Sequence, residues 1–449
     1  MPLPPGPKRP AMLQTAAIVH RPIPFLSHCF ERYGDTFTLR ILGPASPPVV
    51  FLSRPDTLQQ VFTSAAAALE FGQVTQVFRP LVGQDSPIMQ QGDRHHQQRQ
   101  MLMPALHGKH LQGYGRDIQA ITQAVTGSWS VGQSLAIRPW MSEISLQVIL
   151  RVVFGLRPSP RYQHLHLHLS KLLEAVTGPL YSVQFFARLL QQDLGPWSPW
   201  GRFLRRREAI DQLLYAEIAE RRRCPDARQD VLSLLLAAKD IDGQPLSDQE
   251  LRDHLMTLLL LGHETTASSL AWAFYWIHQN LDVRDRLLEE LQPLGALPDP
   301  VVVQKLPYLD ALCRETLRLY PIALISQPRL VRQTLTLEGY RFEPGTVLVP
   351  CIYTAHRRAE TYPNPHRFEP ERFLQHQPSA SEFFPFGGGS RSCIGAALSL
   401  YEMKVVLATV LQRWRLHLDF AQPVRPHRRG ITFVPPERVR FNIQALSPQ

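Results

Sequence analysis

The sequence contains few cysteines and no closely spaced cysteine pair. Only five of its 449 residues are cysteines, an odd number, and they are scattered without a C-x-x-C motif at positions 29, 224, 313, 351 and 393. A disulfide framework needs paired cysteines, and disulfides persist in oxidising compartments. The distribution therefore argues against such a framework and predicts a protein of a reducing compartment.

The sequence also lacks an uninterrupted apolar run long enough to cross a bilayer. Its longest nearly apolar stretch, residues 255–277, is broken in the middle by the polar residues His263, Glu264, Thr265 and Thr266. A carboxylate at mid-bilayer is costly. The first ten residues hold too many prolines and too few apolar side chains for a signal peptide or an anchor. We therefore expect a cytoplasmic monomer without an integral membrane anchor.

No Ser/Gly linker or low-complexity tract divides the chain, so we expect one large domain over residues 1–449. Apolar residues make up 44% and charged residues 19%, which suits a globular core.

Acidic residues are outnumbered 38 to 48 by Lys and Arg, and the net charge of +10 favours an acidic partner. The arginine clusters at 205–207 and 221–223 come without any nucleic-acid-binding motif. We interpret them as solvated helix faces and expect no nucleic-acid partner.

Periodicity predicts a mainly α fold with small β-sheets. Short β-type runs at residues 36–42, 48–52, 335–342 and 346–349 predict strands of one small sheet. We divide the chain into a β-containing N-terminal part (1–90), a helical part (91–320) and a second β-containing part (321–449). The clearest helix begins at a capping box of Ser247 and Glu250 and continues to about Gln279. Its 33 residues span roughly 50 Å, so it is expected to be central.

A glycine-rich segment surrounds the last cysteine. Residues 386–395 read FGGGSRSCIG, and a helix is expected over residues 396–411. The glycines permit close backbone approach around Cys393, and the start of the helix favours the thiolate, the form that binds metals. A buried structural cysteine is one alternative, but it leaves Arg391 and the spaced glycines unexplained. A phosphate-cradling loop is another, but the lysine and Ser/Thr of a P-loop are missing.

This segment fits F-x-x-G-x-R-x-C-x-G, a pattern that resembles the haem-binding loop of the cytochrome P450 family. The resemblance implies the cytochrome P450 fold, with a long central helix over the haem, and haem b as the cofactor. It implies Cys393 as the metal ligand. It also implies that Phe386, Arg391 and Gly395 contribute to cofactor binding.

Residues 262–266, GHETT, resemble the oxygen-activating helix signature of the same family. By that resemblance Glu264 and Thr265 are the catalytic acid–alcohol pair, which delivers protons while the O–O bond is broken. Standing alone, the motif would instead indicate a threonine that caps or kinks the helix. Leu261 occupies a position where the family usually has Ala or Gly. We expect it to narrow the substrate pocket or to shift the substrate.

The pair Glu315 and Arg318 fits E-x-x-R, whose spacing places both side chains on one face of a helix. Together with Arg372 in Pro370-Glu371-Arg372-Phe373, the pair resembles the buried ion triad of the family, which has a structural role. An ordinary surface ion pair is the alternative. The two interpretations differ in what removal of the glutamate does, because a buried arginine without its carboxylate is strongly destabilising.

Haem carries two propionates, which need cations in fixed geometry. Four residues are candidates by resemblance: His95 and Arg99 in an H-x-x-x-R pattern, Arg329, and Arg391 in the cysteine loop. For the histidine, His96 or a plain surface role remains an alternative. The alternating histidines at 164, 166 and 168 offer only two ligands on one helix face, so we interpret them as a polar face rather than a metal site.

The resemblance covers nearly the whole chain and implies a haem-thiolate monooxygenase of the soluble bacterial branch, similar to cyanobacterial fatty-acid and sesquiterpene hydroxylases. Such an enzyme hydroxylates an apolar small molecule with O2 and two electrons. The pocket segments are largely apolar and include Ala323, Leu324 and Ile325. We expect a fatty acid or other long-chain lipid as the substrate, with a terpenoid as the alternative.

The chain has no room for a reductase domain, so we expect a ferredoxin and a ferredoxin reductase as electron donors, with Lys109, Lys404 and Arg413 as candidate docking cations. Two other classes of function remain open. A peroxide-driven peroxygenase would not need Glu264 and Thr265, and a haem-binding sensor would need no proton relay.

Overall fold

The computed structural model describes residues 3–41, 43, 46–71, 75–155, 159–178, 183–185, 190–224, 230–419, 424–430 and 432–444. The chain folds into two compact units. Unit 1 combines residues 1–75 with residues 314–393, and unit 2 combines residues 76–313 with residues 394–449. The expected part boundaries near residues 90 and 320 remain predictions.

Unit 1 is built on a five-stranded sheet of order β1-β2-β8-β5-β3, in which only β2 and β8 pair in parallel. Its apolar core lies between this sheet and neighbouring helices. The strands are β1 (Thr36–Leu39), β2 (Val49–Leu52), β3 (Leu69–Glu70), β5 (Arg329–Val331) and β8 (Val347–Pro350), and the helices are α1 (Ala11–His20), α2 (Pro22–Tyr33), α3 (Pro55–Phe62), η1 (Ala66–Ala68), α18 (Ile352–Ala355), α19 (Arg372–Gln375) and η7 (Gly389–Arg391).

One of the four predicted strand runs does not join this sheet. Residues 335–342 form a separate hairpin of β6 (Leu335–Leu337) and β7 (Tyr340–Phe342). The turn residues Glu338 and Gly339 both have positive φ, 52° and 77°, as a tight two-residue hairpin requires. The prediction of a single sheet is therefore wrong for this run, because the chain turns back on itself after three residues.

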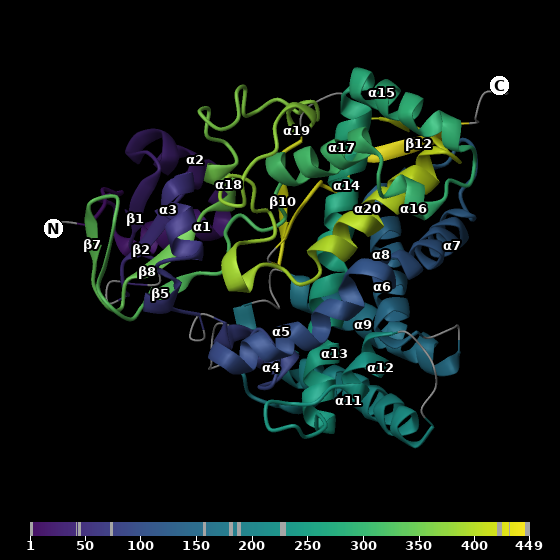
Figure 1. Cartoon of the computed structure of the whole chain (residues 1–449), viewed down its shortest axis with the longest axis horizontal. Coiled ribbons are helices and arrows are strands. Elements are labelled where there is room, and N and C mark those ends of the chain that lie inside the picture. The colour runs from purple at the N-terminus through teal and green to yellow at the C-terminus, as the bar shows by residue number, and fades with distance from the viewer. Residues whose placement is uncertain are drawn as a thin grey trace. The chain divides into compact units, whose positions relative to one another are not determined.

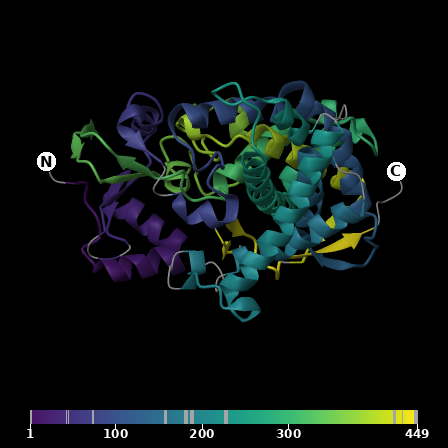
Figure 2. The ribbon, with the colours of Figure 1, turned by 90° about the horizontal axis from the view of Figure 1, so that it is seen from below.

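Unit 2 is almost entirely helical, as the blue and teal ribbon in Figures 1 and 2 shows. Its helices are η2 (Gln76–Phe78), α4 (Arg79–Val82), α5 (Gly92–Leu106), α6 (Gly108–Gly113), α7 (Gly115–Thr126), α8 (Ile137–Phe154), α9 (Pro160–Thr177), η3 (Val183–Phe185), η5 (Gly195–Trp197), α11 (Pro199–Arg223), α12 (Val231–Ala237), α13 (Asp248–Gly262), α14 (Glu264–Gln279), α15 (Leu281–Leu291), η6 (Gln292–Leu294), α16 (Pro300–Val303) and α20 (Ala396–Leu411). Helix α17 (Pro307–Leu319) contains the boundary between the units.

The strands of unit 2 form two small antiparallel sheets, one of order β4-β12-β9 and one of β10 with β11. They are β4 (Ser134–Ala136), β9 (Arg415–Leu418), β10 (His427–Arg429), β11 (Thr432–Val434) and β12 (Arg440–Gln444). The prediction of a mainly helical fold with small sheets is confirmed. Among the described residues, no helix combines the length and apolarity needed to cross a bilayer.

The predicted long helix begins as expected but is interrupted. The capping box of Ser247 and Glu250 is present, and α13 starts at Asp248. The helix then ends at Gly262 and resumes as α14 at Glu264, with His263 at φ −106° between them. A Cβ on Gly262 would lie 2.8 Å from Cδ1 of Ile149 in α8, so the glycine permits the close approach of that helix. The prediction of one continuous helix is therefore wrong at this point.

The arginine clusters are only partly solvated. Arg221 is 4% exposed and forms ion pairs with Glu217 at 3.1 Å and Asp230 at 2.7 Å. Its neighbour Arg222 is partly exposed and pairs with Asp248. The interpretation of residues 221–223 as a solvated face is thus wrong for Arg221, which links α11 to the start of α12 from the inside.

Candidate active site

The cysteine loop of unit 1 is a tight turn that leaves the sulfur-bearing residue exposed. Gly387 and Gly389 have φ of 72° and 71°, a region that side-chain-bearing residues rarely adopt. The backbone N–H of Cys393 donates to the carbonyl of Phe386 at 2.8 Å, which closes the turn. Cys393 itself is exposed. The loop therefore holds a thiol at the surface of a rigid turn.

Packing explains why the middle of this loop carries no side chains. A Cβ on Gly388 would lie 2.4 Å from the ring of Phe62, and a Cβ on Gly389 would lie 2.7 Å from the carbonyl oxygen of Phe62. Phe62, at the end of α3, is part of the apolar core of unit 1. The loop backbone is thus pressed directly against the core, which fixes the position of the turn.

A buried arginine lies next to the same loop. Arg329, in β5, is 1% exposed, and its guanidinium donates to the carbonyls of Gln327 at 2.9 Å and Gly388 at 3.2 Å. It also lies 5.0 Å from the ring centroids of Phe62 and Phe71. Burial first, and then the charge of Arg391, lower the pKa of Arg329 to about 10. None of the contacts described for Arg329 is to a carboxylate, so this cationic pair suits an anionic ligand.

The predicted propionate-binding pair on α5 lies in unit 2. His95 is buried, whereas His96 is exposed and contacts Gln100, so burial distinguishes the two histidines. Arg99 is half-buried and one helical turn further along. The spacing of four residues places His95 and Arg99 on the same face of the helix.

The three residues of the predicted ion triad lie together in unit 1. Glu315 and Arg318 are fully buried and form two hydrogen bonds, from Nε at 2.6 Å and from Nη2 at 2.8 Å. Arg372 donates to the same carboxylate at 3.2 Å. The guanidinium of Arg318 also donates to three backbone carbonyls, those of His356, Pro365 and Arg367. One arginine thereby ties the connection between α18 and α19 to α17 at three points.

The carboxylate of Glu264 is buried in unit 2 between two guanidinium groups. Its Oε1 lies 3.0 Å from Nη1 of Arg138, in α8, and 3.0 Å from Nε of Arg429, in β10. Burial lowers the pKa of Arg138, while Glu264 opposes that shift. Sequence reasoning missed both arginines, because no local pattern connects them to a glutamate more than a hundred residues away. Arg138 stands at the start of α8, which also contains the charged residues Glu143 and Arg151, so its own charge gives no distinct signal.

The neighbouring imidazole is neutral. His263 is 2% exposed, and burial, followed by the charges of Arg138 and Arg429, lowers its pKa to about 3. Its Nε2 lies 3.8 Å from Oε2 of Glu264. The histidine therefore adds no charge to this group at neutral pH, and the charged side chains around it are Glu264 and the two arginines.

The hydroxyl of Thr265 donates to the carbonyl of Leu261 at 2.9 Å, across the interruption between α13 and α14. This is the contact of a threonine that stabilises a kink, and it leaves the oxygen lone pairs available to accept a hydrogen bond. Thr265 and Leu261 are half-buried, although most residues of both helices are fully buried. The two residues therefore lie on a less covered face of the helix pair.

The predicted pocket residues of unit 1 differ in exposure. Leu324 is buried, whereas Ala323 and Ile325 are half-buried.

One of the three predicted docking cations is not available at the surface. The prediction is wrong for Lys404, because this residue is 7% exposed and is bound to Asp310 at 2.6 Å and to the carbonyl of Gln304. Lys109 and Arg413 are exposed. Within the described ranges no cluster of three metal-ligating side chains occurs.

The residues of unit 1 fit a thiolate-bound haem. An exposed cysteine in a rigid turn supplies one sulfur ligand, the ligation expected of haem-thiolate proteins. The Arg329 and Arg391 pair supplies donors for carboxylate groups such as propionates.

Comparison with known proteins agrees with this chemistry. The family model "Cytochrome P450" matches residues 3–442. A protein of Mycobacterium tuberculosis (strain H37Rv) described as "Putative cytochrome P450 135B1" is 34% identical over 448 residues, covering 99% of this chain and 92% of that protein. Another from the same strain, "Putative cytochrome P450 137", is 35% identical over 415 residues, covering 92% and 84%.

Solved structures share the fold. The structure titled "Retinoic acid bound cyanobacterial CYP120A1" superposes with a TM-score of 0.85 and 26% identity over 99% of this chain and 100% of that one. A "cytochrome P450DA heme domain" gives 0.83 at 22% identity, covering 100% and 99%, and shows the fold alone. The chain therefore belongs to the cytochrome P450 family, monooxygenases whose cofactor is haem b.

Proposed function

We propose that this monooxygenase hydroxylates a long-chain apolar molecule, a fatty acid or similar lipid, with electrons from a ferredoxin and its reductase. The observation that carries the proposal is the half-buried face of Leu261 and Thr265 on otherwise buried helices, which combines an apolar surface with a hydroxyl. When bound, the haem supplies the site at which O2 is reduced and one oxygen atom is transferred to a C–H bond.

In this proposal Cys393 would supply the sulfur ligand of the haem. It is flanked by Phe386, whose carbonyl accepts from the N–H of Cys393, and by Gly395 at the start of α20. Four residues bind the propionates: His95, Arg99, Arg329 and Arg391. Arg329 is buried, and none of the contacts described for it is to a carboxylate, which supports its part of this assignment. The triad of Glu315, Arg318 and Arg372 has a structural role, since it fixes the loops that precede the cysteine turn in the chain.

Glu264 and Thr265 move protons in this proposal. Arg138 and Arg429 each lie 3.0 Å from Oε1 of the Glu264 carboxylate and hold it in place. A carboxylate can accept a proton from solvent and pass it on. The hydroxyl of Thr265 donates a hydrogen bond to the carbonyl of Leu261, which leaves its oxygen able to accept a hydrogen bond from a water molecule. The pair therefore acts as the acid–alcohol relay.

In this proposal the substrate class follows from the apolar character of the predicted substrate-contacting residues, which are Leu261 in unit 2 and Ala323, Leu324 and Ile325 in unit 1. A terpenoid is the second candidate, and a specific observation favours it: the cyanobacterial structure of the same fold has retinoic acid bound, a long apolar molecule that ends in a carboxylate. Both candidates are long and apolar. Lys109 and Arg413, both exposed, are the remaining candidates for docking an acidic ferredoxin.

The ligand is tested by the carbon monoxide difference spectrum of the reduced, haem-loaded protein. We expect the thiolate-type Soret band in the wild type and its loss in Cys393→Ser. The matched control is Cys224→Ser, which changes another exposed cysteine and is expected to keep the band. A thiolate-type band that survives in Cys393→Ser contradicts the assignment of the ligand.

The reaction is tested with Thr265→Ala. We expect loss of turnover supported by O2 and a reductase, with turnover supported by hydrogen peroxide retained, since peroxide already carries the protons. Equal loss of both activities contradicts a relay. Failure of oxygen consumption with every ferredoxin pair tried would instead favour a haem-binding sensor. Substrates are then ranked by the shift in haem spin state that fatty acids and terpenoids produce.

A further inference from the structure

A polar cavity of about 430 Å³ lies within unit 2, among α4, α11 and α13. Its volume falls in the range of small-molecule sites, about 300–1,000 Å³. It is lined by Arg79, Pro80, Gly83, Gln84, Arg207, Asp211, Tyr215, Gln249 and Arg252. Three of these side chains are guanidinium groups and one is a carboxylate, so the lining is strongly cationic.

The deepest of the three arginines is neutralised by carboxylates. Arg252 is 2% exposed, and its Nε donates to Asp211 at 2.7 Å while its Nη1 donates to Asp253 at 2.8 Å. Against this one guanidinium the two carboxylates leave one negative charge. The other two arginines of the lining are therefore only half compensated.

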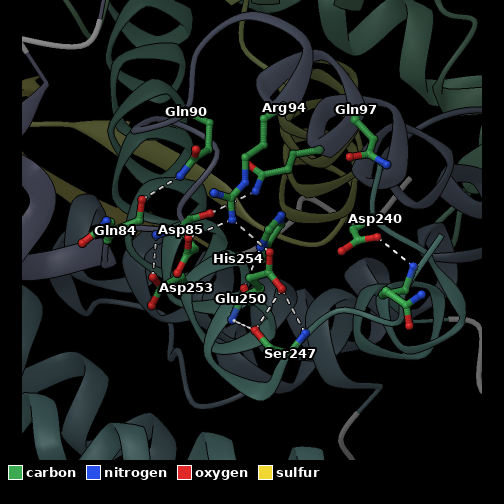
Figure 3. A network of polar contacts seen from close by, with 12 residues as sticks. Gln84, Asp85, Gln90, Arg94, Gln97, Asp240, Ser247, Glu250, Asp253 and His254 are labelled. Atoms are coloured by element: carbon green, nitrogen blue, oxygen red, sulfur yellow. Dashed lines mark hydrogen bonds and ion pairs between the residues drawn. The ribbon is translucent and has the colours of Figure 1, made fainter. Parts of the chain in front are cut away.

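Asp253, which Figure 3 shows beside Asp85, is held in this arrangement by further hydrogen bonds. It is fully buried and also accepts from the backbone N–H of Asp85 at 2.8 Å and from Nε2 of Gln249 at 3.1 Å. Two other carboxylates of that network, Asp85 and Glu250, both contact Arg94. The acidic groups around the cavity are thus held in place by existing partners, and its floor is preorganised.

The outer arginines are differently placed. Arg207 donates through Nη1 to the carbonyl of Pro80 at 2.9 Å, and its Nε lies 3.5 Å from Asp211, beyond a good hydrogen bond. Arg79 is exposed and donates through Nη2 to the neutral side chain of Gln84 at 2.7 Å. Counting Asp253 with the lining, three guanidinium groups face two carboxylates, an excess of one positive charge.

We propose that this cavity binds the carboxylate of an organic monoanion between Arg79 and Arg207. One negative charge balances the excess, and guanidinium groups bind carboxylates through paired N–H donors. Tyr215 and Gln249, which are joined by a 3.0 Å hydrogen bond, give the wall a polar and partly aromatic surface for the rest of a small molecule. Cations are disfavoured by the same arginines.

Two sources could supply this carboxylate, namely the end of a long-chain substrate or a separate small acid. The anion site itself does not depend on the proposed hydroxylation. Only its assignment to the end of a long-chain substrate rests on that proposed function. Both are tested by calorimetric titration of the haem-loaded full chain with octanoate and with acetate, each compared with the primary alcohol of the same length. Calorimetry needs no turnover, so its failure is distinct from failure of the carbon monoxide spectrum or of hydroxylation.

The decisive variant is the double change Arg79→Gln with Arg207→Gln. We expect it to bind octanoate at least about tenfold more weakly, a difference of about 1.4 kcal/mol, and to bind the alcohol unchanged. The matched control is Arg223→Gln, which removes an exposed arginine of the same helix outside the lining and is expected to bind as the wild type does. If the double variant does not fold, the same titrations are made with the single variant Arg79→Gln, which changes an exposed residue.

The two carboxylates distinguish the sources. Binding of octanoate alone assigns the site to the end of a long-chain molecule. Binding of acetate as well, with the same dependence on the two arginines, assigns it to a separate small acid. Either result supports the anion site. Equal affinity for acid and alcohol, unchanged affinity in the double variant, or no binding of either carboxylate overturns the proposal.

Discussion

Removal of the Glu315 carboxylate should destabilise the protein far more than removal of another arginine-paired glutamate. Glu315 is fully buried and accepts two hydrogen bonds from Arg318, one from Arg372 and one from the backbone N–H of Glu369. Glu343, in the same unit, pairs with Arg341 at 2.7 Å, but both side chains are more than half exposed. The two glutamates therefore differ mainly in burial.

The magnitude follows from what Glu315→Ala leaves behind. Arg318 stays fully buried with three carbonyl contacts but no counter-charge. Removing one partner of a buried ion pair costs about 3–5 kcal/mol, chiefly because of the uncompensated charge. In Glu343→Ala the remaining arginine is solvated, so we expect no measurable change. Glu315→Gln keeps an acceptor without the charge and should fall between the two.

Denaturant unfolding of the haem-loaded protein, followed by far-ultraviolet circular dichroism, measures these differences. The shift in midpoint multiplied by the slope m gives the change in the free energy of unfolding, provided that m is the same in both proteins. The haem spectrum is recorded in parallel, because cofactor loss can precede unfolding. If Glu315→Ala loses no more stability than Glu343→Ala, Arg318 is not an uncompensated buried charge and the reasoning fails.

Three further predictions concern the loop, the relay and the response to acid. Gly388→Ala places a Cβ against the ring of Phe62 and should lower the haem content measured by absorbance; Phe62→Leu in the same protein should restore part of it, and no rescue would contradict the packing argument. Arg138→Gln leaves Glu264 with one guanidinium contact, so product formed per reducing equivalent should fall; an unchanged ratio would show that this contact is dispensable. Burial lowers the pKa of His278 from 6.5 to about 4, so the unfolded chain takes up a proton that the folded one excludes, and stability falls between these pH values. Between pH 7 and pH 5 the free energy of unfolding should therefore fall by about 2 kcal/mol less in His278→Phe than in the wild type, as measured by the same unfolding assay. An equal fall in both proteins would refute the prediction.

Local patterns in the sequence were sufficient to predict where some helices begin and end. The helix expected at residues 396–411 has those bounds in the structure, and the capping box at Ser247 starts α13 as expected. Both depend on short-range chemistry, namely a side chain bonding to a nearby backbone group or an apolar periodicity that continues for several turns. Such signals lie within a few residues of each other and can be recognised without tertiary contacts.

Other features depend on contacts that sequence reasoning cannot supply. The interruption at His263 goes together with the close approach of Ile149 in α8 and with the hydroxyl of Thr265 replacing a helical partner of Leu261. Gly262, Thr265 and Thr266 have low helix propensity, but propensity alone does not predict the residue at which the helix ends. The arginine partners of Glu264 come from α8 and β10, and no pattern within either element points to α14.

The places where the fold departs from local rules coincide with the residues that the family resemblance assigns to chemistry. A buried ion pair contributes little net stability compared with apolar packing, yet the buried carboxylate of Glu264 is paired with Arg138 at the start of α8. An uninterrupted helix would satisfy more backbone groups than one that stops at His263. A structural role alone gives no reason to accept both costs at adjacent residues. A relay does, because it needs a charge and a hydroxyl held at fixed positions, and departures of this kind are expected at functional sites.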